Sequence, residues 1–96
     1  MSFTPFYFRI MSCYMYILYS KTIDSYYIGS TCDELSERLG KHNSNHKGFT
    51  GRANDWNVVF FEKYDAKSDA LKREMQLKKW KNRKRIESLI KNHNYK

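Results

Sequence analysis

Residues 14–29, which read YMYILYSKTIDSYYIG, decide the fold of this chain. Two runs rich in aromatic and aliphatic side chains, residues 14–19 and 26–29, lie on either side of a polar segment that carries turn-forming residues. Aromatic and β-branched residues are typical of strands, and a short polar segment between two such runs is typical of a hairpin. This stretch therefore predicts two antiparallel strands.

A helix is predicted directly after the hairpin, over residues 34–43. Leu35 and Leu39 recur at i, i+4 and are expected to face the core. Asp33 precedes this segment and is a residue type that caps helix N-termini. The segment that follows, residues 44–55, is mostly polar and basic with two glycines, and we predict a mobile loop there.

A third strand and two more helices are predicted in the second half of the chain. Residues 56–63 contain the apolar run Val58-Val59-Phe60-Phe61, which is consistent with a strand covered on both faces. Residues 67–80 form a helical pattern with Ser68 or Asp65 as candidate caps. Its apolar side carries Ala70, Leu71, Leu77 and Trp80. Residues 82–92 place Ile86, Leu89 and Ile90 on one helical face, with Asn82 as the expected cap. The fold class is α+β, with a small three-stranded antiparallel sheet flanked by about three helices.

The length and composition fit one small basic domain. The 96 residues suffice for one modest core, and we assign residues 1–12 to a flexible extension, 13–92 to the domain and 93–96 to a tail. Met11 is a candidate natural start within that extension. No stretch approaches the length of a membrane span, so a membrane role is not expected. The two cysteines, Cys13 and Cys32, share no metal-type or redox spacing, and we predict reduced thiols in a cytoplasmic protein.

The charge of the chain favours a polyanionic partner. Lys and Arg number 18 against 10 Asp and Glu, which gives a net charge of +8. A solubilising surface would produce the same sum, so the position of the charges must decide between the two explanations.

Five side chains together suggest phosphodiester hydrolysis: Tyr16, Tyr27, Arg38, His42 and Glu74. Arg38 and His42 stand at i, i+4 on one helical face. Glu74 interrupts the apolar side of a later helix, where a carboxylate needs a partner, either Lys78 or a cation. Hydrolysis needs an activated water and compensation for charge that develops at phosphorus, and these groups supply candidates for both.

The same residues resemble the GIY-YIG nuclease domain. The second family motif is present as Tyr27-Ile28-Gly29, whereas Tyr14-Met15-Tyr16 keeps only the final tyrosine of the first. Further matches follow in order at Glu37-Arg38-Leu39, His42-Asn43, Ala70-Leu71-Lys72-Arg73-Glu74 and Lys78-Lys79-Trp80. The chain is most similar to small stand-alone bacterial members related to the nuclease module of the excision-repair endonuclease.

The resemblance implies a metal-dependent endonuclease acting on DNA, in repair or recombination. Glu74 would bind one divalent cation, Mg²⁺ or Mn²⁺, and Arg38 would hold phosphate oxygens. We favour Tyr16 as the base and Tyr27 as a positioning group, although the sequence does not separate these roles. His42 would bind phosphate or relay a proton.

The predicted DNA contacts are basic residues around this site. They are Lys47, Arg52, Lys78, Lys79, Lys81, Arg83, Lys84 and Arg85. We expect structure-selective or weakly sequence-selective binding of branched, damaged or single-stranded DNA. The alternative is a non-catalytic nucleic-acid-binding module that works with a targeting protein, and a third possibility is a basic surface for an acidic protein. The tyrosines would then only fill strand faces.

Overall fold

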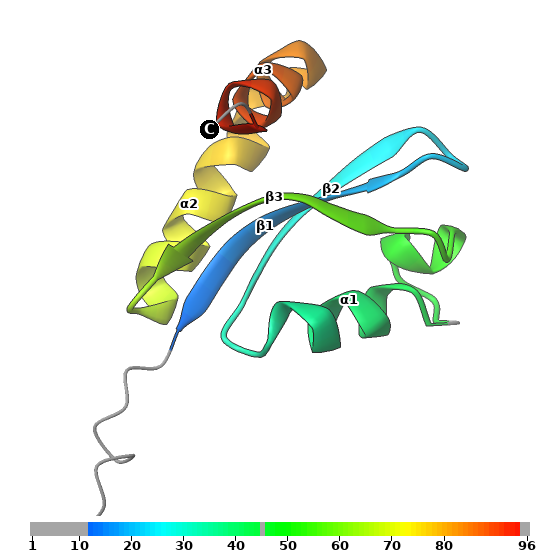
Figure 1. Ribbon diagram of the computed structural model, residues 1–96, viewed down its shortest axis with the longest axis horizontal. Coiled ribbons are helices and arrows are strands. Elements are labelled where there is room, and N and C mark those ends of the chain that lie inside the picture. The colour runs from blue at the N-terminus through cyan, green and yellow to red at the C-terminus, as the bar shows by residue number, and fades with distance from the viewer. Residues whose placement is uncertain (1–11, 45, 95–96) are drawn as a thin grey trace, which may run out of the picture.

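The computed structural model describes residues 12–44 and 46–94. The elements follow in the order β1 (Cys13–Ser20), β2 (Ser25–Thr31), α1 (Leu35–His42), the short 3₁₀ helix η2 (Phe49–Arg52), β3 (Asn57–Tyr64), α2 (Lys67–Trp80) and α3 (Arg83–Asn94). The three strands form one antiparallel sheet in the order β2-β1-β3 (Figure 1). The predicted α+β fold is confirmed.

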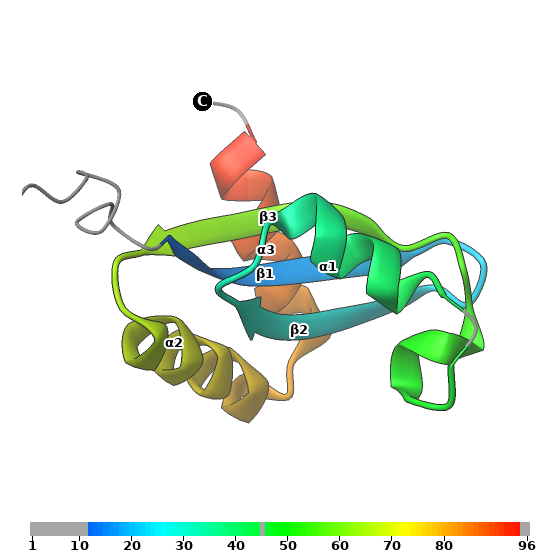
Figure 2. The same ribbon diagram turned by 90° about the horizontal axis from the view of Figure 1, so that it is seen from below.

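The central strand β1 separates two half-cores because successive side chains of a strand point to opposite faces of the sheet. One half-core contains Met15, Ile17, Phe60, Leu77 and Ile86. The other contains Tyr16, Leu18 and Trp56. Figure 2 shows α1 on one face of the sheet and α3 on the other. The sheet thus separates α1 from α2 and α3, and the candidate residues come from both sides of it.

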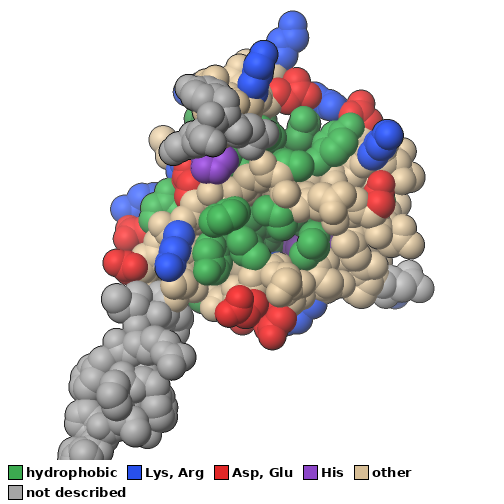
Figure 3. Space-filling view, viewed as in Figure 1, with side chains coloured by type: hydrophobic (Ala, Val, Ile, Leu, Met, Phe, Trp, Pro, Cys, Tyr) green, Lys and Arg blue, Asp and Glu red, His purple; other side chains and the backbone are tan. Residues whose placement is uncertain are grey.

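The third strand, β3, lies at an edge of the sheet, and the face that carries Phe61 is partly exposed, contrary to the prediction that both of its faces are covered. β1 is the covered strand, with Met15, Ile17 and Leu18 fully buried, whereas Phe61 on β3 is 44% exposed. Phe61 belongs to an apolar hollow between α1 and β3, which appears as a cluster of hydrophobic side chains in Figure 3. A run of four apolar residues predicts that a strand forms, but it does not predict where that strand lies in the sheet.

Two of the three predicted helix caps are wrong. α1 begins after Glu34 and α2 after Ala66, and neither N-terminus has a side-chain cap. Asp33 instead pairs with Arg38, a residue of the helix it was expected to cap. At α3, Asn82 Oδ1 accepts a hydrogen bond from the Arg85 amide at 3.1 Å, so the third prediction is confirmed. On α2, Ala70 and Leu77 are buried as expected, but Leu71 is exposed.

The segment between α1 and β3 is tied to the core instead of forming a free loop. Trp56 is buried, and its indole Nε1 donates a hydrogen bond to the Thr50 carbonyl at 2.8 Å. Asn43 bonds the backbone of Trp56 on both sides, accepting from its amide and donating to its carbonyl. These bonds hold η2 against the end of α1.

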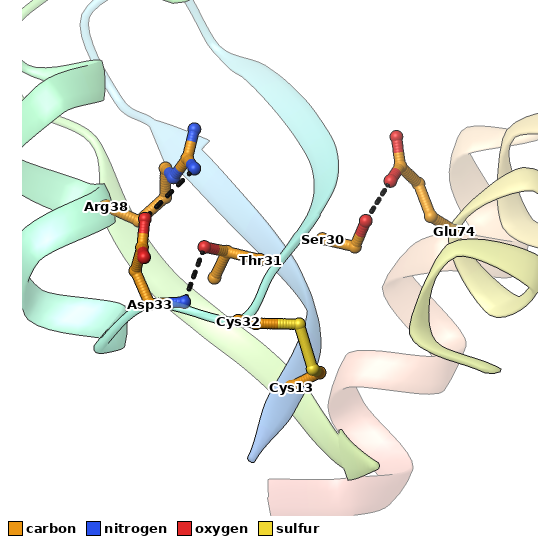
Figure 4. Close-up of a disulfide and its surroundings, with 7 residues drawn as sticks. All are labelled: Cys13, Ser30, Thr31, Cys32, Asp33, Arg38 and Glu74. Atoms are coloured by element: carbon orange, nitrogen blue, oxygen red, sulfur yellow. Dashed lines mark hydrogen bonds and ion pairs between the residues drawn. A yellow bond between two sulfur atoms is a disulfide. The ribbon is translucent and has the colours of Figure 1, made fainter. Parts of the chain in front are cut away.

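Cys13 and Cys32 form a disulfide, so the prediction of reduced thiols is wrong (Figure 4). The hairpin register pairs Tyr14 with Thr31. The two cysteines are the next residues outward and stand opposite each other, with Cα atoms 3.9 Å apart. The prediction considered only spacing along the chain, whereas the pairing of the strands brings these residues together.

The predicted terminal segments fall largely outside the described residues. This holds for residues 1–11 of the expected extension, including Met11, and for residues 95–96 of the expected tail. The last helix continues to Asn94, two residues beyond its predicted end. Among the described helices, none has the length and apolar character needed to cross a bilayer.

Candidate active site

Tyr16 reaches the candidate site by passing over Gly29. The two residues are register partners on β1 and β2. A Cβ atom on Gly29 would lie 2.6 Å from the Tyr16 hydroxyl, closer than side-chain atoms approach one another. The absence of a side chain at Gly29 therefore makes room for the phenol, which is only 2% exposed.

A chain of hydrogen bonds extends from Tyr16 into the segment after α1. Tyr16 Oη lies 2.7 Å from His42 Nε2, and His42 Nδ1 lies 2.8 Å from Thr50 Oγ1. Thr50 Oγ1 is in turn 2.9 Å from His46 Nε2. The chain ends at Gly48, whose amide donates to His46 Nδ1 at 3.0 Å.

The Gly48 amide sets the direction of the whole chain. A backbone N–H can only donate, so His46 Nδ1 is an acceptor and, in neutral His46, Nε2 carries the proton. Thr50 Oγ1 then accepts from His46, and its own buried hydroxyl proton goes to His42 Nδ1. This assignment leaves the His42 proton on Nε2, where it is donated to Tyr16 Oη. The phenol proton of Tyr16 is left free for another acceptor.

The directions of the pKa shifts of His42 and Tyr16 favour the neutral form of both side chains. Burial lowers the pKa of His42 from its ordinary 6.5 to about 4, with Arg38 and His46 adding to the effect. Burial also raises the pKa of the Tyr16 phenol, as does Tyr27. Arg38 lowers that pKa and Glu74 raises it, so both charged groups interact electrostatically with the Tyr16 phenol.

Arg38, His42 and Tyr27 line one hollow of about 380 Å³, together with residues that include Phe49 and Thr50. The Tyr27 and His42 rings are 4.8 Å apart. Arg38 Nη2 donates a hydrogen bond to Asp33 at 3.2 Å. The hollow thus offers a guanidinium, an imidazole and a phenol to one ligand.

Glu74 lies around the edge of β2 from this hollow. Its Oε1 accepts a hydrogen bond from Ser30 at 2.6 Å, and its Oε2 forms an ion pair with Lys78. Figure 4 shows Glu74 and Arg38 on the two sides of the end of β2. Lys78 also stands over the Tyr27 ring, 5.9 Å from its centre. Three of the five predicted residues, Tyr27, Arg38 and His42, therefore line one hollow. Tyr16 is buried behind His42 and hydrogen-bonded to it, and Glu74 is joined to the group through Lys78 and Tyr27.

A comparison with known protein families matches residues 12–87 to the GIY-YIG catalytic domain. The chain belongs to the GIY-YIG family. The match includes the whole sheet, α1 and α2, and therefore all five candidate residues. No curated protein and no solved structure matched the chain in the other two comparisons. GIY-YIG domains are nuclease domains with DNA as substrate, and they generally depend on a divalent cation.

Glu74 fits the divalent cation that GIY-YIG nucleases generally need. Among the described residues, no group of three His, Cys, Asp or Glu side chains is placed to hold a metal ion. Mg²⁺ accepts a site with one carboxylate, because water and substrate phosphate complete its octahedral shell. Glu74 is 13% exposed, is oriented by Ser30 and faces a half-exposed lysine that can move away. This donor set suits a hard cation such as Mg²⁺ or Mn²⁺.

The eight basic residues predicted to bind DNA lie in different surroundings, and only some of them line a hollow. Lys78, Lys81 and Arg83 line a second hollow beside Tyr27. Arg83 also pairs with Asp24 and Glu87. Arg52 lies over the Phe49 ring, whereas Arg85 lies over Trp80. The remaining three, Lys47, Lys79 and Lys84, are exposed and line neither hollow.

Sequence reasoning missed Ser30, His46, Phe49 and Thr50. His46 stands four residues after His42, but α1 ends at His42, so helical spacing gave no reason to link them. Thr50 and Phe49 lie in η2, within the predicted loop. Ser30 follows the second motif directly, and its position next to Gly29 is the one signal that could have drawn attention to it.

Proposed function

We propose that this protein is a metal-dependent endonuclease that hydrolyses phosphodiester bonds in DNA. The observation that carries the proposal is the hydrogen-bonded chain from His46 through Thr50 and His42 to Tyr16, beside a hollow that also contains Arg38. A buried structural tyrosine is satisfied by a single partner, either a donor or an acceptor. A tyrosine that takes up a proton needs an oriented donor at its oxygen, because the donor stabilises the phenolate.

Tyr16 is proposed as the base. Tyr16 first loses its phenol proton to solvent. The attacking water then gives a proton to the Tyr16 phenolate while the water oxygen bonds to phosphorus, and the bond from phosphorus to the leaving sugar oxygen breaks. The leaving oxygen takes its proton from solvent. His42 Nε2–H and the charge of Arg38 favour the phenolate that must form first, against the burial that disfavours it. Tyr27 walls the same hollow and would position the water or the phosphate.

Arg38 and Glu74 would hold the two sides of the scissile phosphate. Arg38 is always charged and suits bidentate contact with phosphate oxygens, once it exchanges Asp33 for the substrate. A divalent cation bound at Glu74 would supply positive charge that neutralises the phosphate and favours the Tyr16 phenolate. Ser30 keeps the carboxylate in place for this role.

The proposed substrates are branched, damaged or single-stranded DNA, cut with structural or weak sequence selectivity. The basic residues lie on helix ends and loops and carry few groups suited to reading base edges. A role in repair or recombination, with a targeting protein as a possible partner, would follow from such selectivity. A DNA substrate favours the cytoplasm as the place of action, although disulfides such as Cys13–Cys32 are most often kept in oxidising compartments.

The test is cleavage of a panel of DNA structures with Mg²⁺ or Mn²⁺. The parent should nick at least one branched or single-stranded DNA, and Glu74→Ala should abolish nicking while binding stays near normal. Arg38→Ala should also lose cleavage. If Glu74→Ala cleaves as well as the parent, the proposed cation site is wrong.

A non-catalytic DNA-binding module is the second candidate, because both key charges are already paired within the protein. Asp33 occupies Arg38, and Lys78 occupies Glu74. In a module without catalysis these pairs would persist when DNA binds. Asp33→Asn, which frees Arg38, should then change DNA binding only by the small general effect of one lost negative charge. In a nuclease the same variant should bind DNA more tightly, since a competitor for the phosphate has been removed.

A further inference from the structure

We propose that the hollow beside Tyr27 binds an unpaired DNA base, so that the enzyme takes DNA with unpaired nucleotides next to the bond it cuts. This inference rests on the proposed nuclease function and names the substrate class of the same site. The hollow has a volume of about 480 Å³. Its wall includes Tyr26, Tyr27, Phe49, Lys78, Lys81 and Arg83.

The hollow is continuous with the candidate active site. Tyr27 and Phe49 line both this hollow and the one that contains Arg38 and His42. The two rings are nearly parallel, with 20° between their planes and 6.2 Å between their centres. A strand whose phosphate contacts Arg38 therefore has its neighbouring nucleotide beside these rings.

The aromatic surface is open to a ligand. Phe49 is 43% exposed, so its ring is accessible to a ligand. Bases stack on exposed aromatic rings, and stacking tolerates any sequence because every base has a π-face. In a duplex the base faces are already covered by their neighbours. Only an unpaired or extruded base can use Phe49.

A cation lies over each of three aromatic rings in and beside the hollow. The distances to the ring centres are 5.9 Å for Lys78 Nζ over Tyr27, 5.1 Å for the Arg83 guanidinium over Tyr26 and 5.2 Å for the Arg52 guanidinium over Phe49. A base that stacks on one of these rings would displace the cation from the ring face and keep that positive charge within reach of its phosphate. The apolar hollow beside the other edge strand, between α1 and β3, has no Lys or Arg in its wall. Charge therefore selects the Tyr27 hollow for nucleic acid.

The test measures binding without cleavage, by fluorescence anisotropy in EDTA at fixed ionic strength. The probes are a labelled single strand of about 12 nucleotides and a strand of equal length and charge in which every base is replaced by an abasic site. The parent should bind the base-bearing strand about tenfold more tightly than the abasic one. Phe49→Leu should lose most of this preference and Phe49→Tyr should keep it.

Phe61→Leu is the matched control, because Phe61 is the same residue type with nearly the same exposure, 44%, on the other hollow. It should retain the full preference. Equal binding of both strands by the parent, or an unchanged preference in Phe49→Leu, would overturn the inference. Because no divalent cation is present, the result does not depend on cleavage. A preserved preference in EDTA, together with no nicking of the DNA panel in Mg²⁺ or Mn²⁺, would refute the nuclease proposal alone.

Discussion

The tautomer of His42 is fixed by residues that lie outside its own helix. His42 is the last residue of α1, and both ring nitrogens have partners, Tyr16 at Nε2 and Thr50 at Nδ1. Thr50 alone could either donate or accept. The amide of Gly48, acting through His46, removes this choice. A single backbone N–H thereby decides whether the His42 nitrogen that faces Tyr16 carries the proton.

Thr50→Val should remove the hydrogen bond that fixes the tautomer of His42. The valine has the shape of threonine but cannot donate to Nδ1, so His42 can place its proton on either nitrogen. We expect cleavage to fall by about 100-fold, the usual size of a contribution from acid–base groups. Thr50→Ser should retain activity because it keeps the hydroxyl. Imidazole ¹⁵N chemical shifts report the tautomer directly, and a parent protein with the proton on Nδ1 would contradict the assigned direction.

The buried imidazole should also make the fold sensitive to acid. The unfolded chain binds a proton at His42 near pH 6.5, whereas the folded protein does so only at about 4. The contribution of neutral His42 to the free energy of unfolding is therefore fully present above pH 6.5. It falls by on the order of 3 kcal/mol as the pH drops toward 4. Urea unfolding between pH 7 and 4, in the parent and in His42→Gln, measures this. A parallel pH dependence in both proteins would show that another group is responsible.

At the scale of elements, the C-terminal end of β2 organises the site. Three successive residues act there, since Ser30 orients Glu74, Thr31 Oγ1 accepts the amide of Asp33, and Cys32 joins β1 (Figure 4). Asp33 then holds Arg38. The two charged groups proposed to hold phosphate are therefore both attached to one strand end.

Reduction of the Cys13–Cys32 disulfide should loosen that strand end and lower stability. The bond joins residues 19 apart, and closing a loop of this size in the unfolded chain is worth about 3 kcal/mol. The midpoint of urea unfolding should fall when a reductant is added. A Cys13→Ala/Cys32→Ala variant should show a low midpoint that no longer responds to reductant. Two free thiols in the untreated parent would contradict the bond itself.

The sequence predicted the elements better than the links between them. Alternating apolar patterns are local, so the hairpin, the third strand and the three helices appear near their predicted positions. Asp33 shows the limit, because its type is typical of a cap, but Arg38 competes for it once α1 forms. Thr50 shows it again, since its role exists only when η2 packs against His42. Contacts between distant segments depend on packing that no local pattern contains.

At the scale of the whole molecule, positive charge is spread wider than the site. The net charge is +8, yet the residues beside the two hollows are a minority of the cations. Arg85 lies over Trp80, and Arg73 is paired with Glu62. If the proposed DNA path is real, a few cations should carry most of the salt dependence, while the others only raise the general potential.

Two double variants separate these contributions. Arg52→Ala/Lys81→Ala removes cations beside Phe49 and in the Tyr27 hollow, whereas Lys79→Ala/Lys84→Ala removes exposed lysines that line neither hollow. Each of the two variants loses two positive charges. Each phosphate contact contributes about 0.7 to 0.9 to the slope of log affinity against log salt, so the first pair should reduce the slope by roughly 1.5 and weaken binding at every salt concentration. The second pair should change the slope little, and equal losses in both would mean that total charge, with no defined path, attracts the DNA.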